Sequence, residues 1–131
     1  MKQVLSVGQM KHLQELGLDT SDASMCWIKD SEGNRFLSVN DEYCYEMSHL
    51  SPVPTYTLQD ILDKLPRYIN DFGTKYKLHI EPTFAGPWCI SYQMGICEPL
   101  IFELAENLLD ADYDMLCWCI ENGYVKVGEE E

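Results

Sequence analysis

The chain has 131 residues, of which 46% are hydrophobic and 11% aromatic; this suits one folded domain over residues 1–131 and argues against intrinsic disorder. Nine Lys and Arg stand against 22 Asp and Glu, so the formal net charge at pH 7 is −13. A surface of this charge repels phosphate groups, and direct binding to nucleic acid or to an anionic membrane is therefore not expected.

The sequence shows no segment typical of a membrane span or a secretory signal. The longest apolar run, Met115–Ile120, is far shorter than the roughly 18 residues of a spanning helix. The apolar stretch near the N-terminus is too brief for a signal peptide. We therefore expect a cytoplasmic protein, in which the six cysteines are reduced thiols.

The first expected elements are a short helix and a β-hairpin. The helix runs from about Val7 to Leu16, with Ser6 suited to cap its start and Gly17 to end it. The hairpin pairs Met25–Lys29 with Arg35–Val39 around a turn-forming Asp-Ser-Glu-Gly-Asn segment.

The middle of the chain predicts a connection followed by a second helix. Tyr43–Met47 is typical of a short strand or a turn, and Ser51–Pro54 of an extended connector. Thr57 and Asp60 have the spacing of a capping box. The helix behind them should end near residue 65, because proline follows at 66. Its apolar residues at helical spacing are Leu58, Ile61, Leu62 and Leu65.

A second hairpin and a long helix complete the expected fold. Lys75–Glu81 and Trp88–Met94 alternate apolar with polar residues, which predicts strands with one buried face. The final helix is expected from Pro99 to Asn122-Gly123. The sequence thus predicts an α+β fold: an antiparallel sheet built from two β-hairpins, packed by the long C-terminal helix and two shorter helices.

Acidic residues are concentrated toward the C-terminus. Residues 98–131 contain ten Asp and Glu and one Lys, so this segment carries −9. On a helical wheel that starts at Ile101, an apolar face lies opposite an acidic one. Four of the acids form our candidate interaction surface: Glu103, Glu106, Asp110 and Asp114.

Asp112 departs from this pattern, because it falls about 20° from the centre of the apolar face. A carboxylate there must be hydrogen-bonded, protonated or in contact with water. We favour a helix that extends past the edge of the sheet, where Asp112 meets water, over a functional site. A hydrogen bond to Tyr92 or His49 would favour the site instead.

Cys117 and Cys119 flank a tryptophan near the end of the expected helix. Cys119 falls at the centre of the apolar face and is expected in the core. Cys117 falls among the acids and is expected to be an exposed thiol with a raised pKa. Thiols on opposite faces of a helix cannot ligate one zinc ion, so no metal site is expected here.

The remaining thiols and histidines form no recognisable catalytic pattern. Cys44 and His49 are a conceivable nucleophile and base, but no third group orients them. His12 is expected on a surface helix and His79 on the polar side of a strand. No sequence motif for a phosphate, a dinucleotide or a metal is present, and no catalytic residue and no cofactor are expected.

The segments YTLQDILDKLP, YKLHIEPT with PWCISYQMG, and LLDADYDMLCWCIENGYV give a layout of capped helix, hairpin and C-terminal helix. This layout resembles a group of small acidic proteins of Bacteroidales-type bacteria that are often associated with phage or mobile elements. Trp88, Tyr92 and Trp118–Gly123 carry the likeness, which covers roughly residues 55–126. It implies an accessory role in a bacterium and transfers no activity and no site residue.

These features favour a non-enzymatic interaction module that binds a basic protein through its acidic C-terminal helix. Two alternatives stay open. One is a DNA mimic that inhibits a nucleic-acid-binding protein, and the other is a small thiol-dependent or hydrolytic enzyme. A homodimer that buries Tyr and Trp side chains is a further option.

Overall fold

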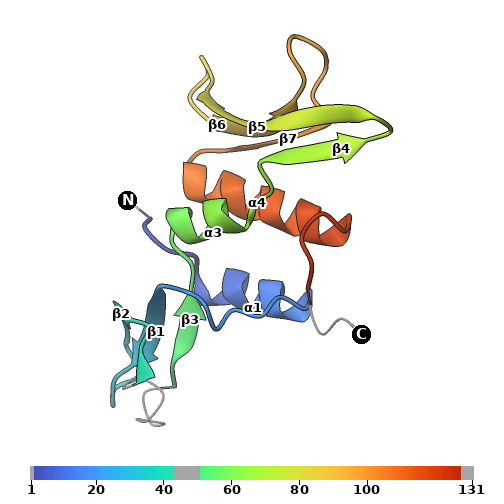
Figure 1. Ribbon diagram of the computed structural model, residues 1–131. Coiled ribbons are helices and arrows are strands. Elements are labelled where there is room, and N and C mark those ends of the chain that lie inside the picture. Colours follow the sequence, from blue (N-terminus) through green and yellow to red (C-terminus); the bar gives the residue numbers. More distant parts are fainter. Residues whose placement is uncertain (1, 43–50, 128–131) are drawn as a thin grey trace.

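The computed structural model describes residues 2–42 and 51–127, whose helices and strands form three layers (Figure 1). A four-stranded antiparallel sheet is one outer layer, and α3 (Leu58–Lys64) and α4 (Leu108–Glu121) lie beneath it. α1 (Val7–Glu15) and a three-stranded antiparallel sheet lie on the other side of these helices. The predicted α+β class is confirmed, but the two hairpins belong to two separate sheets.

The three-stranded sheet contains the first predicted hairpin. Its strands are β1 (Met25–Lys29), β2 (Arg35–Val39) and β3 (Val53–Thr55), in the order β2-β1-β3. β3 lies where we expected only a connector. A proline is tolerated within it because β3 is an edge strand, where one side of the backbone needs no partner. The element predicted at residues 43–47 lies outside the described residues.

The four-stranded sheet extends the second predicted hairpin by one strand on each side. Its strands are β4 (Tyr68–Asp71), β5 (Thr74–Pro82), β6 (Trp88–Gln93) and β7 (Ile101–Ala105), in the order β4-β5-β6-β7. β5 and β6 are the predicted hairpin. Sequence patterns did not predict β4, which is only four residues long, or β7.

The prediction that the last helix starts at Pro99 is wrong. Ile101–Ala105 is strand β7, which pairs antiparallel with β6. Its side chains alternate between half-buried and exposed, as expected for a strand. A segment of only five residues is too short for its apolar pattern to distinguish a strand from a helix. α4 begins only after Asn107, whose side chain accepts a hydrogen bond from the Asp110 backbone N–H at 2.8 Å. Its predicted end at Asn122 is confirmed.

Both short helices begin and end as the sequence predicts. Ser6 caps α1 and forms a capping box with Gln9, and Gly17 follows the helix with a φ of 100°. Thr57 and Asp60 form the capping box of α3. No helix in the described ranges, 2–42 and 51–127, is long and apolar enough to cross a membrane.

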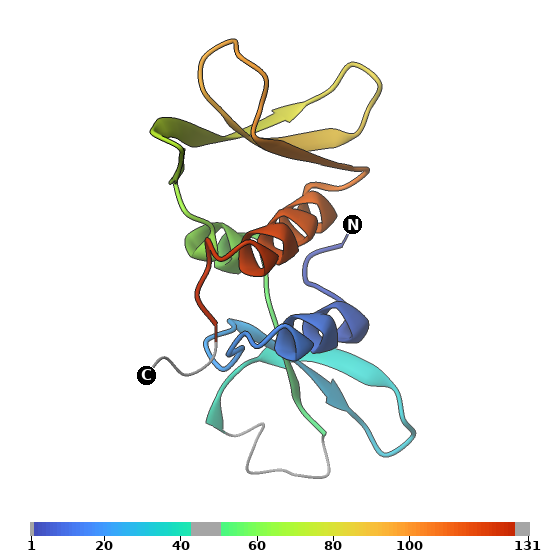
Figure 2. The same ribbon diagram turned by 90° about the vertical axis from the view of Figure 1, so that its right-hand side faces the viewer.

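The hydrophobic core surrounds α4. The helix packs against β6 and β7 on one side and against α3 beside it. Turning the view shows α1 along the side of α4 that faces away from the four-stranded sheet (Figure 2). All of these elements contribute to one continuous cluster, whose fully buried members include Met10, Leu13, Ile61, Ile90, Tyr92, Met115 and Leu116.

The three-stranded sheet is attached to this core through Leu5 and Asp60. The carbonyl of Leu5 accepts hydrogen bonds from the Trp27 indole at 2.9 Å and the Thr55 hydroxyl at 2.7 Å. The Asp60 carboxylate accepts from the Ser24 backbone at 3.0 Å, the Ser24 hydroxyl at 2.6 Å and the Thr57 backbone at 3.0 Å. Asp60 therefore caps α3 and also holds the chain segment that leads into β1.

Asp60→Ala should lower the free energy of unfolding by about 2 kcal/mol, because it removes three hydrogen bonds, one of them a helix cap. Asp63→Ala is the matched control one turn along the same helix, since the exposed Asp63 accepts only from Gln59 at 2.9 Å. Urea unfolding of both variants measures the difference. Equal effects of the two substitutions would contradict the role assigned to Asp60.

Candidate functional site

The four acids predicted to share one helix face come from two elements. Glu103 is on β7, Glu106 is in the connection to α4, and Asp110 and Asp114 are on α4. The prediction of a single acidic helix face is therefore wrong, because β7 replaces the first part of that helix. We call the surface formed by these four residues the β7–α4 seam.

Glu103 and Asp114 lie close together across the seam. On β7, Glu103 shares a face with Ile101 and Ala105, both of which pack against the core beside α4. Burial raises the pKa of Glu103, and the nearby carboxylate of Asp114 raises it further. Burial likewise raises the pKa of Asp114, with a second contribution from Asp110. No Lys, Arg or His of residues 2–42 and 51–127 forms an ion pair with Glu103 or Asp114.

Asp110, in contrast, is fully engaged within the protein. Its carboxylate accepts hydrogen bonds from Lys2 at 2.9 Å, from the Gln9 amide at 3.0 Å and from the Asn107 amide at 2.9 Å. Burial raises the pKa of Asp110, but these contacts outweigh it and hold the pKa below its usual value. Asp110 thus ties the N-terminal segment to the start of α4 and is not available as a free charge.

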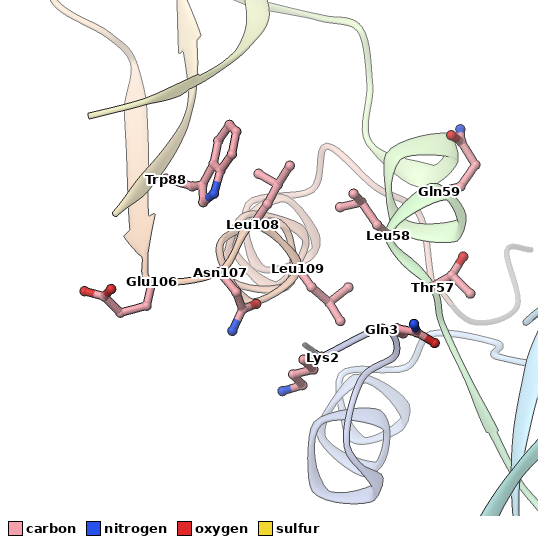
Figure 3. Close-up of a pocket in the computed structure, with 10 residues that line it drawn as sticks. All are labelled: Lys2, Gln3, Thr57, Leu58, Gln59, Trp88, Glu106, Asn107, Leu108 and Leu109. Atoms are coloured by element: carbon pink, nitrogen blue, oxygen red, sulfur yellow. The ribbon is translucent and has the colours of Figure 1, made fainter. Parts of the chain in front are cut away.

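Glu106 lies beside an apolar pocket at the starts of α3 and α4, which begin on the same side of the molecule (Figures 1 and 3). The pocket has a volume of about 640 Å³, within the range of ligand pockets. Leu58, Leu108 and Leu109 project into the space between the two helices, and Trp88 lies above Leu108 (Figure 3). Lys2, Gln3, Gln59 and Glu106 form its polar rim.

The sequence carried one signal for this pocket, which our sequence reasoning missed. Leu58 and Leu108 are the first residues of their helices, directly after the caps Thr57 and Asn107. Apolar side chains in the first turn of a helix lie at its end, so they are buried only when another part of the protein covers that end. Both leucines are only half-buried, so the two helix starts leave an apolar hollow at the surface.

Asp112 is buried, with 0% of its surface exposed. The prediction that it meets water is therefore wrong: α4 does not extend past the sheet at this point. Neither carboxylate oxygen has a hydrogen-bond partner among the described residues. Tyr92, the partner suggested from the sequence, donates to the Pro66 carbonyl at 2.7 Å instead, and His49 lies outside the described residues. Burial raises the pKa of Asp112 to about 7.

The two cysteines of α4 are both buried. Cys119 is 0% exposed, which confirms its predicted place in the core. Cys117 is only 9% exposed, so the expected surface thiol is wrong. Burial raises the pKa of each thiol to about 11; for Cys117, Asp114, Glu121 and Glu103 add to the shift. Both are therefore protonated at neutral pH, a poor state for a nucleophile.

The other candidate residues of the sequence do not come together in a catalytic group. His12 and His79 are on the surface, with side chains 45% and 47% exposed. Cys44 and His49 lie outside the described residues. Within residues 2–42 and 51–127, no three His, Cys, Asp or Glu side chains are grouped so that they could hold a metal ion.

Comparisons of the chain with protein-family models, with curated proteins and with solved structures found no match. Its function must therefore be inferred from the chemistry of its own surface. The β7–α4 seam and the adjoining apolar pocket are the features of the described residues that bear on binding.

Asp112→Asn should remove a pH dependence of stability. The folded state raises the pKa of Asp112 from 3.8 to about 7, so it binds the proton more tightly than the unfolded state does. The contribution of Asp112 to stability is thus unimpaired below pH 4 and falls as the pH rises toward 7, by an amount on the order of 4 kcal/mol. The variant should equal the wild type near pH 4 and exceed it in stability at pH 8.

Urea unfolding at several pH values measures this difference, and Asp114→Asn on the same helix is the control. Asp114 is partly exposed, so its substitution should change the pH dependence much less. If the stabilities of the wild type and Asp112→Asn stay parallel from pH 4 to pH 8, Asp112 is not a buried titrating group.

Proposed function

We propose that the protein is a non-enzymatic interaction module that binds a basic protein partner through the β7–α4 seam. The observation that carries this proposal is the Glu103–Asp114 pair, two carboxylates held close together without a cation from the described residues. The net charge of −13 gives the whole protein a negative electrostatic potential, which also attracts a basic partner.

Some other acids of the protein do have a cation close by. Asp110 pairs with Lys2, Asp22 pairs with Lys64, and Glu81 lies 3.1 Å from His79. At the seam, burial and a neighbouring carboxylate disfavour the charged state of each group: Asp114 acts on Glu103, and Asp110 acts on Asp114. A Lys or Arg from a partner would offset that repulsion. The electrostatic cost that the free protein carries would then be relieved in the complex and would favour binding.

The geometry gives less support to the alternatives. A DNA mimic needs free acids spread along an extended surface, whereas Asp110 in the middle of the seam is already neutralised by Lys2. A thiol enzyme would need a reactive cysteine: burial raises the pKa of Cys117 to about 11, and the other candidate, Cys44, lies outside the described residues. Our proposal includes a cytoplasmic accessory role in a bacterium, associated with a phage or mobile element, through the resemblance noted above.

Glu103→Gln combined with Asp114→Asn should abolish capture of the partner from a bacterial lysate. The matched control is Glu15→Gln with Glu32→Gln, which removes the same charge from exposed sites on α1 and in the β1–β2 turn. At about 0.05 M salt, the wild type and the control should retain the same proteins, and both should release them near 0.5 M because salt screens the contact.

Unfolding in urea provides the control for folding. The seam variant should be at least as stable as the wild type at pH 7, because burial and a nearby carboxylate raise the pKa of each group and neutralisation removes that cost. A seam variant that retains the partner as well as the control does, or binding that is insensitive to salt, would contradict the proposal.

A further inference from the structure

β7 is one of the two edge strands of the four-stranded sheet. It pairs with β6 on one side, and no described strand pairs with its other side. An edge strand directs the N–H and C=O groups of alternate residues away from the sheet, where another extended chain can pair with them. β7 has the sequence Ile-Phe-Glu-Leu-Ala, without lysine or proline; its one charged residue, Glu103, disfavours pairing with an acidic or purely apolar strand but not with a basic one.

The two faces of β7 differ in chemistry. Ile101, Glu103 and Ala105 face α4, where the carboxylate of Asp114 lies near Glu103. Phe102 and Leu104 face away from α4 and are 53% and 50% exposed. The strand therefore offers negative charge on its inner face and an apolar surface on its outer face.

We propose that β7 accepts an extended segment of the basic partner as a fifth strand of the sheet, with basic and apolar side chains in alternation. This inference rests on the function proposed above and specifies how the partner binds. In an added strand, the side chains on the inner face lie beside Glu103 and Asp114, where Lys or Arg forms ion pairs. The side chains on the outer face lie beside Phe102 and Leu104, where β-branched or aromatic residues pack best.

Charge distinguishes β7 from two other edge strands, β2 and β4. β2 is an edge strand with exposed Phe36 and Val39, and the charges at its hairpin end are of both signs, Lys29 and Arg35 beside Asp30 and Glu32. β4 is the opposite edge of the four-stranded sheet, and Lys75 lies over its Tyr68 ring at 4.3 Å. Cations thus lie at both of these edges, whereas the carboxylates of Glu103 and Asp114 beside β7 have no ion pair with a described cation and attract a basic strand.

Charge also disfavours a second copy of this chain as the occupant of the β7 edge. Antiparallel pairing of two β7 strands centred on Glu103 would place two glutamates directly opposite each other, in addition to the two copies of Asp114. Like charges directly opposite each other destabilise a strand pair. The edge therefore suits a basic segment of another protein better than self-association.

A short synthetic peptide of alternating lysine and valine tests the proposal with the intact protein. Two further peptides have the same sequence and charge but carry backbone N-methyl groups, one on every lysine and the other on every valine. Strand addition uses the N–H groups of one set only, so one methylated peptide should bind at least about tenfold more weakly and the other should bind nearly as well as the parent. Hydrogen exchange should slow at the amides of β7 in the complex, and not at those of β2.

Three outcomes would overturn strand addition, and they separate it from the proposed function. Equal, salt-sensitive binding of all three peptides would leave the acidic seam as a docking surface but exclude pairing with β7. Slowed hydrogen exchange at β2 in place of β7 would mean that the peptide pairs with β2 and that β7 is the wrong edge. No binding by any of the peptides at low salt would contradict both strand addition and the binding of basic segments at the seam.

Discussion

The burial of α4 is the constraint on which the rest of the structure depends. The four-stranded sheet covers one side of this helix, and α1 and α3 cover others, so eight of its 14 residues are buried. This explains why Cys117 and Cys119 are both inside although they fall on different faces of the helix. It also explains Asp112, whose charged form is disfavoured because the sheet and the helix exclude water from it without supplying a hydrogen bond. The apolar contacts around α4 outweigh this cost.

The same packing produces the β7–α4 seam. β7 must lie against α4 to bury Ile101 and Ala105, and the alternation of the strand then places Glu103 on the helix side as well. Lys2 neutralises Asp110 at the start of the helix, but no described cation reaches the next turn, where Asp114 lies. The closeness of the two carboxylates thus follows from the strand alternation of β7 and the position of Asp114 on α4 together, and the pair lies beside an open strand edge.

The sequence predicted correctly those helices and strands that turns, helix caps or alternation within the segment itself specify. The hairpin of β1 and β2, the capping boxes of α1 and α3, and the alternation in β5 and β6 are of this kind. β7 was assigned to a helix because five residues fit both periods, and only its pairing with β6 decides between them. The burial of Asp112 and of Cys117 depends on what covers α4, which no pattern within the helix can reveal. Of the four predicted acids, Asp114 lies near Glu103 and Asp110, which come from a strand and a helix rather than from one helical face.

The central claim is that Glu103 and Asp114 repel each other in the free protein. A carbon-detected NMR titration of the Glu103 carboxyl, in the wild type and in Asp114→Asn, tests it most directly. The pKa of Glu103 should lie above 4.5 in the wild type and should fall when Asp114 is neutralised. A pKa of Glu103 at or below 4.5, or one that is the same in both proteins, would mean that the two carboxylates do not interact. The seam would then have no repulsion that a basic partner could relieve.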